Sequence, residues 1–247
     1  MNRNLVIDIG NSMTKLAVFD GSELISLREC LHGDFLKNIK GEEYANVSRC
    51  ILSSTKNVDK DAISAVESKG PTLVFSPSST AIPIGNLYAS KKTLGADRLA
   101  NAVGASTLFP QKNCLVVDCG TALTFDFVSS GSEYVGGAIS LGLRMRFEAL
   151  HHYTDKLPLI EAMDYDNSLF VGNDTQSSIL LGVINGMVGE IRSTINRASA
   201  TFEDLGVIMT GGDALFLEKK INSGIFVSRI LTLVGLNSIL NYNAQYH

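Results

Sequence analysis

A stretch near the N-terminus recurs in the middle of the chain. Residues 5–18 read LVIDIGNSMTKLAV, and residues 115–128 read LVVDCGTALTFDFV. Aspartate, glycine and threonine align between the copies, as Asp8, Gly10 and Thr14 with Asp118, Gly120 and Thr124. In each copy an apolar strand ends in a carboxylate, and a glycine turn leads into a second strand. Such a turn offers backbone N–H groups to an anion, with an acid nearby to hold a cation. The repeat therefore predicts two similar lobes that grip one phosphate-bearing ligand.

The segments around the two copies predict one plan used twice, with hairpin strands followed by alternating helix and strand. Beyond the first hairpin, strands are expected at residues 25–30, 50–54, 73–76, 114–118, 122–128, 134–140 and 207–209. Helices are expected at residues 59–69, 96–109, 142–153, 175–200 and 230–240, the last packing back across the lobe junction. We expect an α/β protein of the actin-like ATPase class, in which each lobe is a mixed β-sheet flanked by helices. Residues 1–112 form the N-terminal lobe and residues 113–247 the C-terminal lobe.

Composition excludes several classes of function. The net charge of the 247 residues is −4 and no basic run is present, whereas binding to a nucleic-acid backbone needs clustered Lys and Arg. No apolar run approaches the roughly 18 residues of a membrane span, and the N-terminus enters a strand without a signal peptide. The four cysteines lack metal-ligand spacing and are expected to be small core residues in a reducing cytoplasm: Cys30, Cys50, Cys114 and Cys119.

The first turn is the more strongly charged of the two. Lys15 follows it at a distance from which its ammonium group can reach a phosphate, and its counterpart in the second copy is Phe125. Gly, Asn and Ser are also ordinary residues of a hairpin turn, and Lys15 alone is equally compatible with a solvated surface lysine. The asymmetry indicates two turns with different roles on one nucleotide.

Two further features support a nucleotide site. Asp118 ends an apolar strand, where a carboxylate is costly to bury unless it binds a cation or accepts hydrogen bonds. Asp8 holds the matching place, so the two acids are expected to converge on the metal ion of a nucleotide. The segment Thr210-Gly211-Gly212-Asp213 follows a strand and opens a helix, and its glycines allow close approach of an adenine or ribose. A Gly-Gly turn alone is common.

In this arrangement the sequence resembles the superfamily of acetate and sugar kinases, Hsp70-type ATPases and actin. Further motifs narrow the resemblance: Gly95-Ala96-Asp97-Arg98, Gly136-Gly137-Ala138-Ile139 with Gly142, Leu157-Pro158, and Gly172-Asn173-Asp174-Thr175. Together they look like type III pantothenate kinase, and the resemblance runs from Asp8 to Asp213. Two positions depart from the family pattern: Ser12 replaces a Thr, and Leu141 replaces a Pro whose ring would stiffen the loop.

The resemblance implies ATP-dependent phosphorylation of the pantothenate hydroxyl, the first step of coenzyme A biosynthesis, by a homodimer. Asp97 would be the general base, and Asp118 would hold a monovalent cation (K⁺ or NH₄⁺). ATP would come with Mg²⁺, for which Asp8 is the candidate ligand. The implied ATP-binding residues are Asp8, Ile9, Gly10, Asn11, Ser12, Met13, Thr14, Lys15, Thr121, Gly211 and Gly212. The implied pantothenate-binding residues are Tyr88, Gly95, Ala96, Asp97, Arg98 and Thr175, some of them contributed by a partner chain.

The chemistry of Asp97 and Arg98 agrees with this implication. An Asp at the mouth of a helix can be a simple N-cap, but it can also take the proton of an alcohol that attacks a phosphate. The planar guanidinium of Arg98 suits a carboxylate, which pantothenate carries and a neutral sugar lacks.

Two other functions stay open at this stage. One is a kinase of the same fold with a different alcohol substrate. The other is a nucleotide-binding regulator or assembly subunit without catalysis, although such a protein would have no need to keep Asp97, Lys15 and Asp118.

Two further groups of polar residues are expected to have no catalytic role. His151 and His152 are placed at a helix C-terminus, where imidazoles suit the helix dipole, and the set Arg144, Arg146 and Glu148 is placed on a solvated helix face, Arg144 being close to the glycine loop.

Overall fold

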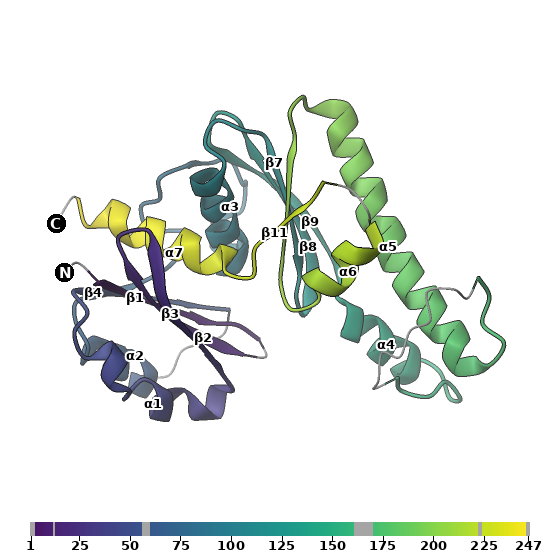
Figure 1. Ribbon diagram of the computed structural model, residues 1–247, viewed down its shortest axis with the longest axis horizontal. Coiled ribbons are helices and arrows are strands. Elements are labelled where there is room, and N and C mark those ends of the chain that lie inside the picture. Colours follow the sequence, from purple (N-terminus) through teal and green to yellow (C-terminus); the bar gives the residue numbers. More distant parts are fainter. Residues whose placement is uncertain (1–2, 12, 56–59, 161–169, 222–223, 246–247) are drawn as a thin grey trace. The chain divides into compact units, whose positions relative to one another are not determined.

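The computed structural model describes residues 3–11, 13–55, 60–160, 170–221 and 224–245. The chain divides into two compact units (Figure 1). The first comprises residues 1–112, 127–136 and 230–247, and the second comprises residues 113–126 and 137–229.

The first unit is built on a five-stranded sheet with the order β3-β2-β1-β4-β5. Its strands are β1 (Arg3–Ile9), β2 (Thr14–Asp20), β3 (Glu23–Cys30), β4 (Arg49–Ser54) and β5 (Thr72–Val74). The first three are antiparallel neighbours, whereas β4 pairs parallel with β1, and β5 with β4. The two hairpins place the turn between β1 and β2 at one end of the sheet, where the returning β3 also ends.

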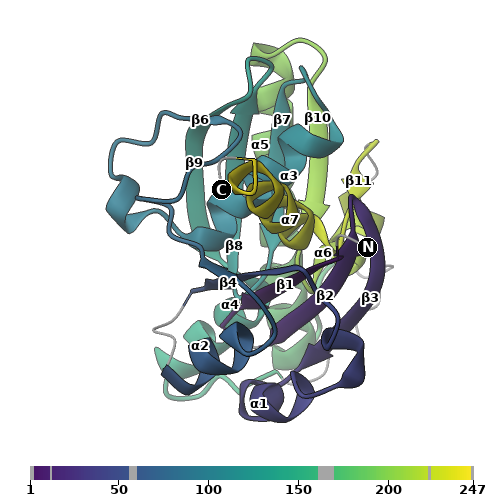
Figure 2. The ribbon, with the colours of Figure 1, turned by 90° about the vertical axis from the view of Figure 1, so that its left-hand side faces the viewer.

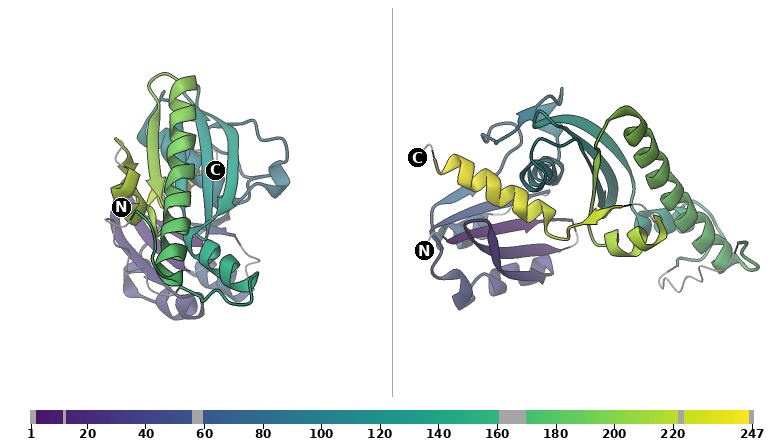
Figure 3. Two further views of the ribbon diagram at one scale, coloured as in Figure 1. Left: turned by 90° about the vertical axis from the view of Figure 1, so that its right-hand side faces the viewer. Right: turned by 45° about the horizontal axis from the view of Figure 1, so that its top comes forward.

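Helices cover both faces of this sheet (Figure 2). On one face lie α1 (Phe35–Asn38) and α2 (Lys60–Glu67), and between them and the sheet is an apolar core that includes Leu5, Ile7, Leu16 and Leu52. On the other face lies α7 (Leu231–Asn243), which packs closely on α3 (Ala96–Leu108) (Figure 3). A Cβ on Gly235 would overlap the Ala100 carbonyl of α3, so this helix contact needs a glycine.

Amide side chains join α7 to β1, the central strand of the first sheet, by hydrogen bonds. Asn4 of β1 donates hydrogen bonds to Asn237 (2.8 Å) and Asn241 (2.7 Å), and Asn237 donates to the carbonyl of Gly21 (2.8 Å). Hydrogen bonds compensate the cost of burying these polar groups. The last helix of the chain is thereby fixed to the first strand of the first unit.

The second sheet repeats the plan of the first. Its order is β11-β10-β7-β8-β9-β6, formed by β6 (Gly85–Asn86), β7 (Cys114–Cys119), β8 (Ala122–Ser129), β9 (Glu133–Leu141), β10 (Gly206–Thr210) and β11 (Phe226–Val227). Strands β7, β8 and β9 follow one another as β1, β2 and β3 do, and β10 and β11 add parallel strands on the β7 side as β4 and β5 do beside β1. Strands β8 and β9 continue into residues of the first unit, where β6 pairs parallel with β9.

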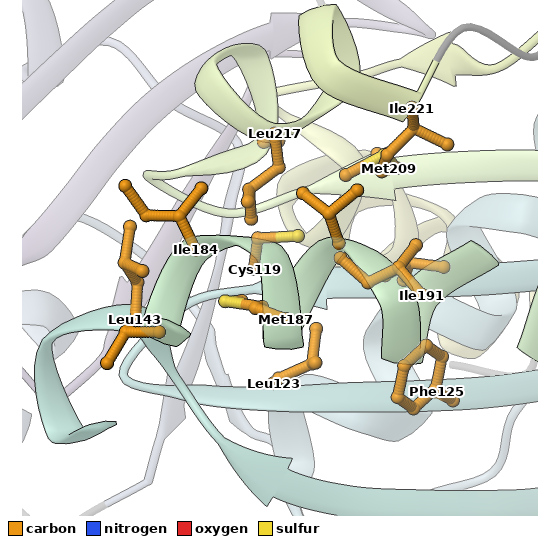
Figure 4. Packing of buried hydrophobic residues seen from close by; sticks show 14 of the residues in the cluster. Cys119, Leu123, Phe125, Leu143, Ile184, Met187, Ile191, Met209, Leu217 and Ile221 are labelled. Atoms are coloured by element: carbon orange, nitrogen blue, oxygen red, sulfur yellow. The ribbon is translucent and has the colours of Figure 1, made fainter. Parts of the chain in front are cut away.

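One face of the second sheet carries the second core. The helices are α4 (Leu143–His152), the long α5 (Thr175–Thr201), which crosses the sheet in Figure 3, and α6 (Ala214–Ile221). Figure 4 shows their apolar side chains meeting those of the strands, among them Leu123, Phe125, Met187 and Leu217. Phe125 points into this core and is buried, as Leu16 is in the core of the first unit. The expected match of Phe125 with Lys15 is therefore wrong, because Lys15 lies on the opposite face of its strand from Leu16.

The predicted fold class is confirmed, and the predicted strands and long helices are found within a few residues of their expected bounds. Residue 59 of the expected helix 59–69 lies outside the described residues. Short elements were not predicted: β6, β11, α1, and the 3₁₀ turns η1 (His32–Asp34), η2 (Glu42–Tyr44) and η3 (Lys91–Thr93). Within the ranges that the structure describes, no helix has the length and apolar character needed to cross a bilayer.

Candidate active site

The first predicted phosphate turn connects β1 to β2. Asp8 and Lys15 are cross-strand partners in this hairpin, so their side chains emerge on the same face of the sheet. The Gly10 N–H donates to the Met13 carbonyl (3.1 Å) and closes the turn. Ile9 and Gly10 are half-buried, Asn11 and Met13 are exposed, and Ser12 lies outside the described residues. The turn thus exposes Asn11 and Met13 to solvent, and Asp8 and Lys15 lie on the two strands that it connects.

A histidine that was not predicted to take part lies against this turn. The Nδ1 atom of His32 is 2.9 Å from the Thr14 hydroxyl, and its Nε2 atom is 3.0 Å from the Asn11 carbonyl oxygen. Thr14 is fully buried. The pairing of β2 with β3 brings residue 32 here, because Thr14 is opposite Cys30.

The predicted catalytic aspartate lies in the first turn of α3. Gly95 is the N-cap of this helix, and the Asp97 carboxylate accepts a hydrogen bond from the Arg98 N–H (2.8 Å). The N-cap interpretation of Asp97 is therefore wrong, since that position belongs to Gly95. A Cβ on Gly95 would lie 2.5 Å from Asp97 Oδ1, so the glycine leaves room for the carboxylate. Asp97 is half-buried, and the positive end of the helix dipole favours a negative charge here.

Two of the predicted pantothenate ligands meet beside this helix start. The guanidinium carbon of Arg98 is 5.7 Å from the ring centroid of Tyr88, within cation–π range. Arg98 is buried, with 5% exposure. Tyr134 of β9, which was not predicted, packs its ring 5.9 Å from that of Tyr88. Gly136 has a φ of +133°, which L side chains rarely adopt, so the backbone conformation favours a glycine beside the Tyr88 ring.

The second turn and the late glycine pair lie side by side in the second unit. Residues Gly120 and Thr121 connect β7 to β8, and Thr210 is the register partner of Asp118. Gly211 follows with a φ of +93°, and a Cβ there would lie 2.6 Å from Asp118 Oδ1. The Asp213 N–H donates to the Cys119 carbonyl (3.0 Å), and burial raises the pKa of the Asp213 carboxyl. The acid, the turn and the glycine pair form one local site.

Arg146, rather than Arg144, binds the end of β9, where Leu141 lies. Its Nε donates to the Leu141 carbonyl (2.8 Å), and its Nη2 donates to the Ser140 hydroxyl (3.2 Å) and forms an ion pair with Glu190. The expectation of a solvated face is wrong for Arg146, which is largely buried, but it describes the exposed Arg144–Glu148 pair. Hydrogen bonds from Arg146 thus hold the last two residues of β9 in place.

Thr175 lies in a pocket of about 1040 Å³ between α4 and α5. Arg146, Tyr153, Asp174 and Ser178 also line it. Asp174 caps α5 by accepting the Ser177 N–H (2.7 Å), and this hydrogen bond lowers the pKa of its carboxyl. Among the described residues that line this pocket, Thr175 is the only predicted site residue. Asp118 and Gly211, which belong to the same unit, do not line it.

Two oxygen atoms lie close to Gly211, at the place where a cation site was predicted from Asp118. Asp118 Oδ1 and the Cys119 carbonyl both crowd the position that a Gly211 Cβ would fill, and carboxylate and carbonyl oxygens suit a hard cation. In the described part of the chain, no group of three or more His, Cys, Asp or Glu is placed to bind a metal.

Burial raises the pKa of the Cys50 thiol to about 11, and all four cysteines are buried, which agrees with their expected role in the core. His151 binds the Leu157 carbonyl (2.8 Å) at the end of α4.

Comparison with known proteins agrees with the observed fold. Among solved structures, a protein from Campylobacter jejuni named as a Baf family transcriptional activator matches with a TM-score of 0.65 at 21% identity, covering 98% of this chain and 99% of that one. A ROK family glucokinase from Streptomyces griseus matches with a TM-score of 0.54 at 11% identity, covering 99% of this chain and 100% of that one. These likenesses show the fold.

Sequence comparison shows the family. The chain is 39% identical over 242 residues to the type III pantothenate kinase of Christiangramia forsetii, covering 97% of this chain and 98% of the relative. The family model of type III pantothenate kinase matches residues 4–197. The chain belongs to the type III pantothenate kinase family.

Proposed function

We propose that this protein transfers the γ-phosphoryl group of ATP to the hydroxyl of pantothenate, with Asp97 as the general base. Membership of the family supports the reaction, and the observation that carries the assignment of the base is the placement of Asp97. Its carboxylate is half-buried at the start of α3, next to a buried arginine and an aromatic ring.

The turn after β1 is proposed to bind the ATP phosphates. Residues 8–15 offer backbone N–H groups and the Lys15 ammonium to the anion. Thr121, Gly211 and Gly212 are proposed to make the remaining contacts with ATP. Mg²⁺ bound with ATP, with Asp8 as its candidate ligand, would neutralise charge that develops on the phosphates.

Asp97 is proposed to accept the proton of the attacking hydroxyl. In phosphoryl transfer the attacking oxygen bonds to the γ-phosphorus while the bond to the β–γ bridging oxygen breaks, and ADP leaves with the electrons of that bond. The proton of the alcohol passes to the Asp97 carboxylate. Since this carboxylate already accepts one hydrogen bond from the Arg98 N–H, its orientation is fixed before the substrate arrives.

Arg98 and Tyr88 are proposed to recognise pantothenate, together with Gly95 and Ala96. The Arg98 fork offers paired donors to the pantothenate carboxylate. The Tyr88 ring lies beside the guanidinium group, and the buried ring of Tyr134 packs against Tyr88. Thr175 is proposed to contact the substrate of the partner subunit in a homodimer, with its hydroxyl in the pocket between α4 and α5.

Asp118 is proposed to hold the monovalent cation, K⁺ or NH₄⁺, with the Cys119 carbonyl oxygen as a second donor. A bound monovalent cation would add positive charge beside the nucleotide. Gly211 then serves the cation as well as ATP, because only a glycine leaves the Asp118 carboxylate in its place.

The experiment is a coupled assay of ADP release with ATP, Mg²⁺ and K⁺, with and without pantothenate. Pantothenate is expected to stimulate ADP release, and mass spectrometry is expected to find 4′-phosphopantothenate. Release that pantothenate leaves unchanged, while another alcohol stimulates it, would identify a kinase with a different substrate. Replacing K⁺ by Na⁺ is expected to slow turnover, and an equal rate would refute a selective cation site at Asp118.

A further inference from the structure

His32 contacts both sides of the turn that is proposed to bind the ATP phosphates. Its two ring nitrogens lie 2.9 Å from the Thr14 hydroxyl and 3.0 Å from the Asn11 carbonyl oxygen. We infer that His32 is a positioning residue for this turn, which it holds in the shape that binds ATP. The inference rests on the proposed role of the turn, although His32 itself touches only the protein.

The two contacts assign the proton on the neutral imidazole ring. A carbonyl oxygen can only accept, so Nε2 carries the hydrogen that binds Asn11. Nδ1 then accepts from the Thr14 hydroxyl, which is buried. The ring therefore bridges an exposed backbone oxygen and a buried side chain.

The contact with Asn11 bears on anion binding. A carbonyl oxygen that turns toward a phosphate repels it, whereas backbone N–H groups attract it. Because the peptide unit is planar, fixing the direction of one carbonyl fixes the orientation of the whole unit. His32 holds the Asn11 oxygen on its ring, and it thereby keeps this acceptor from the anion.

The register of the sheet makes the contact possible. Thr14 begins β2 and pairs with Cys30, the last residue of β3. His32 begins the 3₁₀ turn η1 two residues later. The ring thus comes from the segment that follows a neighbouring strand, and Asn11 and Met13 of the turn stay exposed.

Three substitutions separate the two contacts. His32→Phe keeps a ring of similar shape but loses both hydrogen bonds. In His32→Gln the side-chain amide reaches the position of Nε2 and can still donate to the Asn11 carbonyl. In His32→Asn the shorter amide replaces Nδ1 and reaches only Thr14. Asn38→Ala is the matched control, because Asn38 donates to the Asp34 carbonyl (2.8 Å) in the same segment without touching the turn.

Each variant is measured in two ways: by the Michaelis constants for ATP and for pantothenate, and by equilibrium binding of a fluorescent ATP analogue. We expect His32→Phe to raise the Michaelis constant for ATP and the dissociation constant of the analogue about tenfold, the effect of losing two modest hydrogen bonds. The Michaelis constant for pantothenate should stay within about twofold of the wild-type value. His32→Gln should recover most of the loss, His32→Asn less, and Asn38→Ala should match the wild type.

Equal dissociation constants of the analogue for wild type, His32→Gln and His32→Asn would overturn the inference. An equal rise of the Michaelis constants for ATP and for pantothenate in His32→Phe would overturn it too. Circular dichroism checks that the variants are folded. If His32→Phe does not fold, the comparison of the other two variants decides, because His32→Gln should bind the analogue more tightly than His32→Asn. A wild-type protein that binds the analogue but shows no pantothenate-stimulated ADP release would refute the proposed function, while the binding series still tests His32.

Discussion

Gly211→Ala adds one carbon atom, the Cβ, at the point where residue 211 lies against Asp118. The φ of Gly211 is +93°, a region that L side chains rarely adopt. An added Cβ would lie 2.5 Å from the Cys119 carbonyl carbon and oxygen and 2.6 Å from Asp118 Oδ1. Two of these atoms are backbone, so a change of rotamer cannot relieve the overlap.

The expected loss of stability has two parts. A side chain at this φ costs about 1–3 kcal/mol, as other strained backbone conformations do. Overpacking that moves the backbone of β7 adds about 1–3 kcal/mol. The sum of about 2–6 kcal/mol is expected to lower the midpoint of thermal unfolding by at least about 4 °C in a chain of this size.

The matched control is Gly212→Ala, since a Cβ at Gly212 meets nothing within 4 Å and its φ is ordinary. The chain has no tryptophan, so circular dichroism is the appropriate measure of unfolding. Gly211→Ala is expected to unfold well below the wild type, and Gly212→Ala within about 1 °C of it, since exposed changes have small effects. Equal midpoints for the two variants would refute the packing of Gly211 against Asp118.

Three further predictions concern the pocket, a titrating acid and a buried thiol. Thr175→Val should raise the Michaelis constant for pantothenate about two- to tenfold, with Gln176→Ala, outside the pocket, as the control; an unchanged value would exclude Thr175 from the substrate site. Because burial raises the pKa of Asp213 in the folded chain, its contribution to stability is present at low pH and is lost as the pH rises through that raised value. Asp213→Asn should therefore raise the unfolding midpoint at pH 7 and not at pH 3, and a parallel shift at both would contradict the assignment. With a pKa of about 11, Cys50 should resist iodoacetamide at pH 8 in the folded protein, as peptide mapping would show, and rapid labelling would contradict its burial.

The repeat carried most of what the sequence could predict about the fold. Apolar runs at Leu5 and Leu115, each ending in Asp and a glycine turn, follow local rules of strand and turn formation. They identified both hairpins, and the spacing of apolar residues identified the long helix from Thr175. The shared topology of the two sheets follows from this repetition.

Residues that depend on contacts between distant segments escaped prediction. His32 reaches the first turn through the register of β2 and β3, and Tyr134 of β9 contacts Tyr88, which lies just after β6. Arg146 looked like a solvated residue because helical spacing cannot show that Glu190 of another helix faces it. Similarly, Asp97 looked like an N-cap, because sequence alone leaves a helix boundary uncertain by a residue or two.

The proposed reaction depends most on Asp97, which is proposed to take the proton of the pantothenate hydroxyl. Asp97→Asn keeps the size of the side chain and an oxygen that can accept from the Arg98 N–H, but it cannot act as a base. The direct measurement is kcat with saturating ATP, Mg²⁺ and pantothenate, beside equilibrium binding of an ATP analogue. We predict a fall in kcat of about 10²- to 10⁴-fold, the usual contribution of a general base, with ATP binding within about twofold of the wild type. A kcat within about threefold of the wild-type value would contradict it.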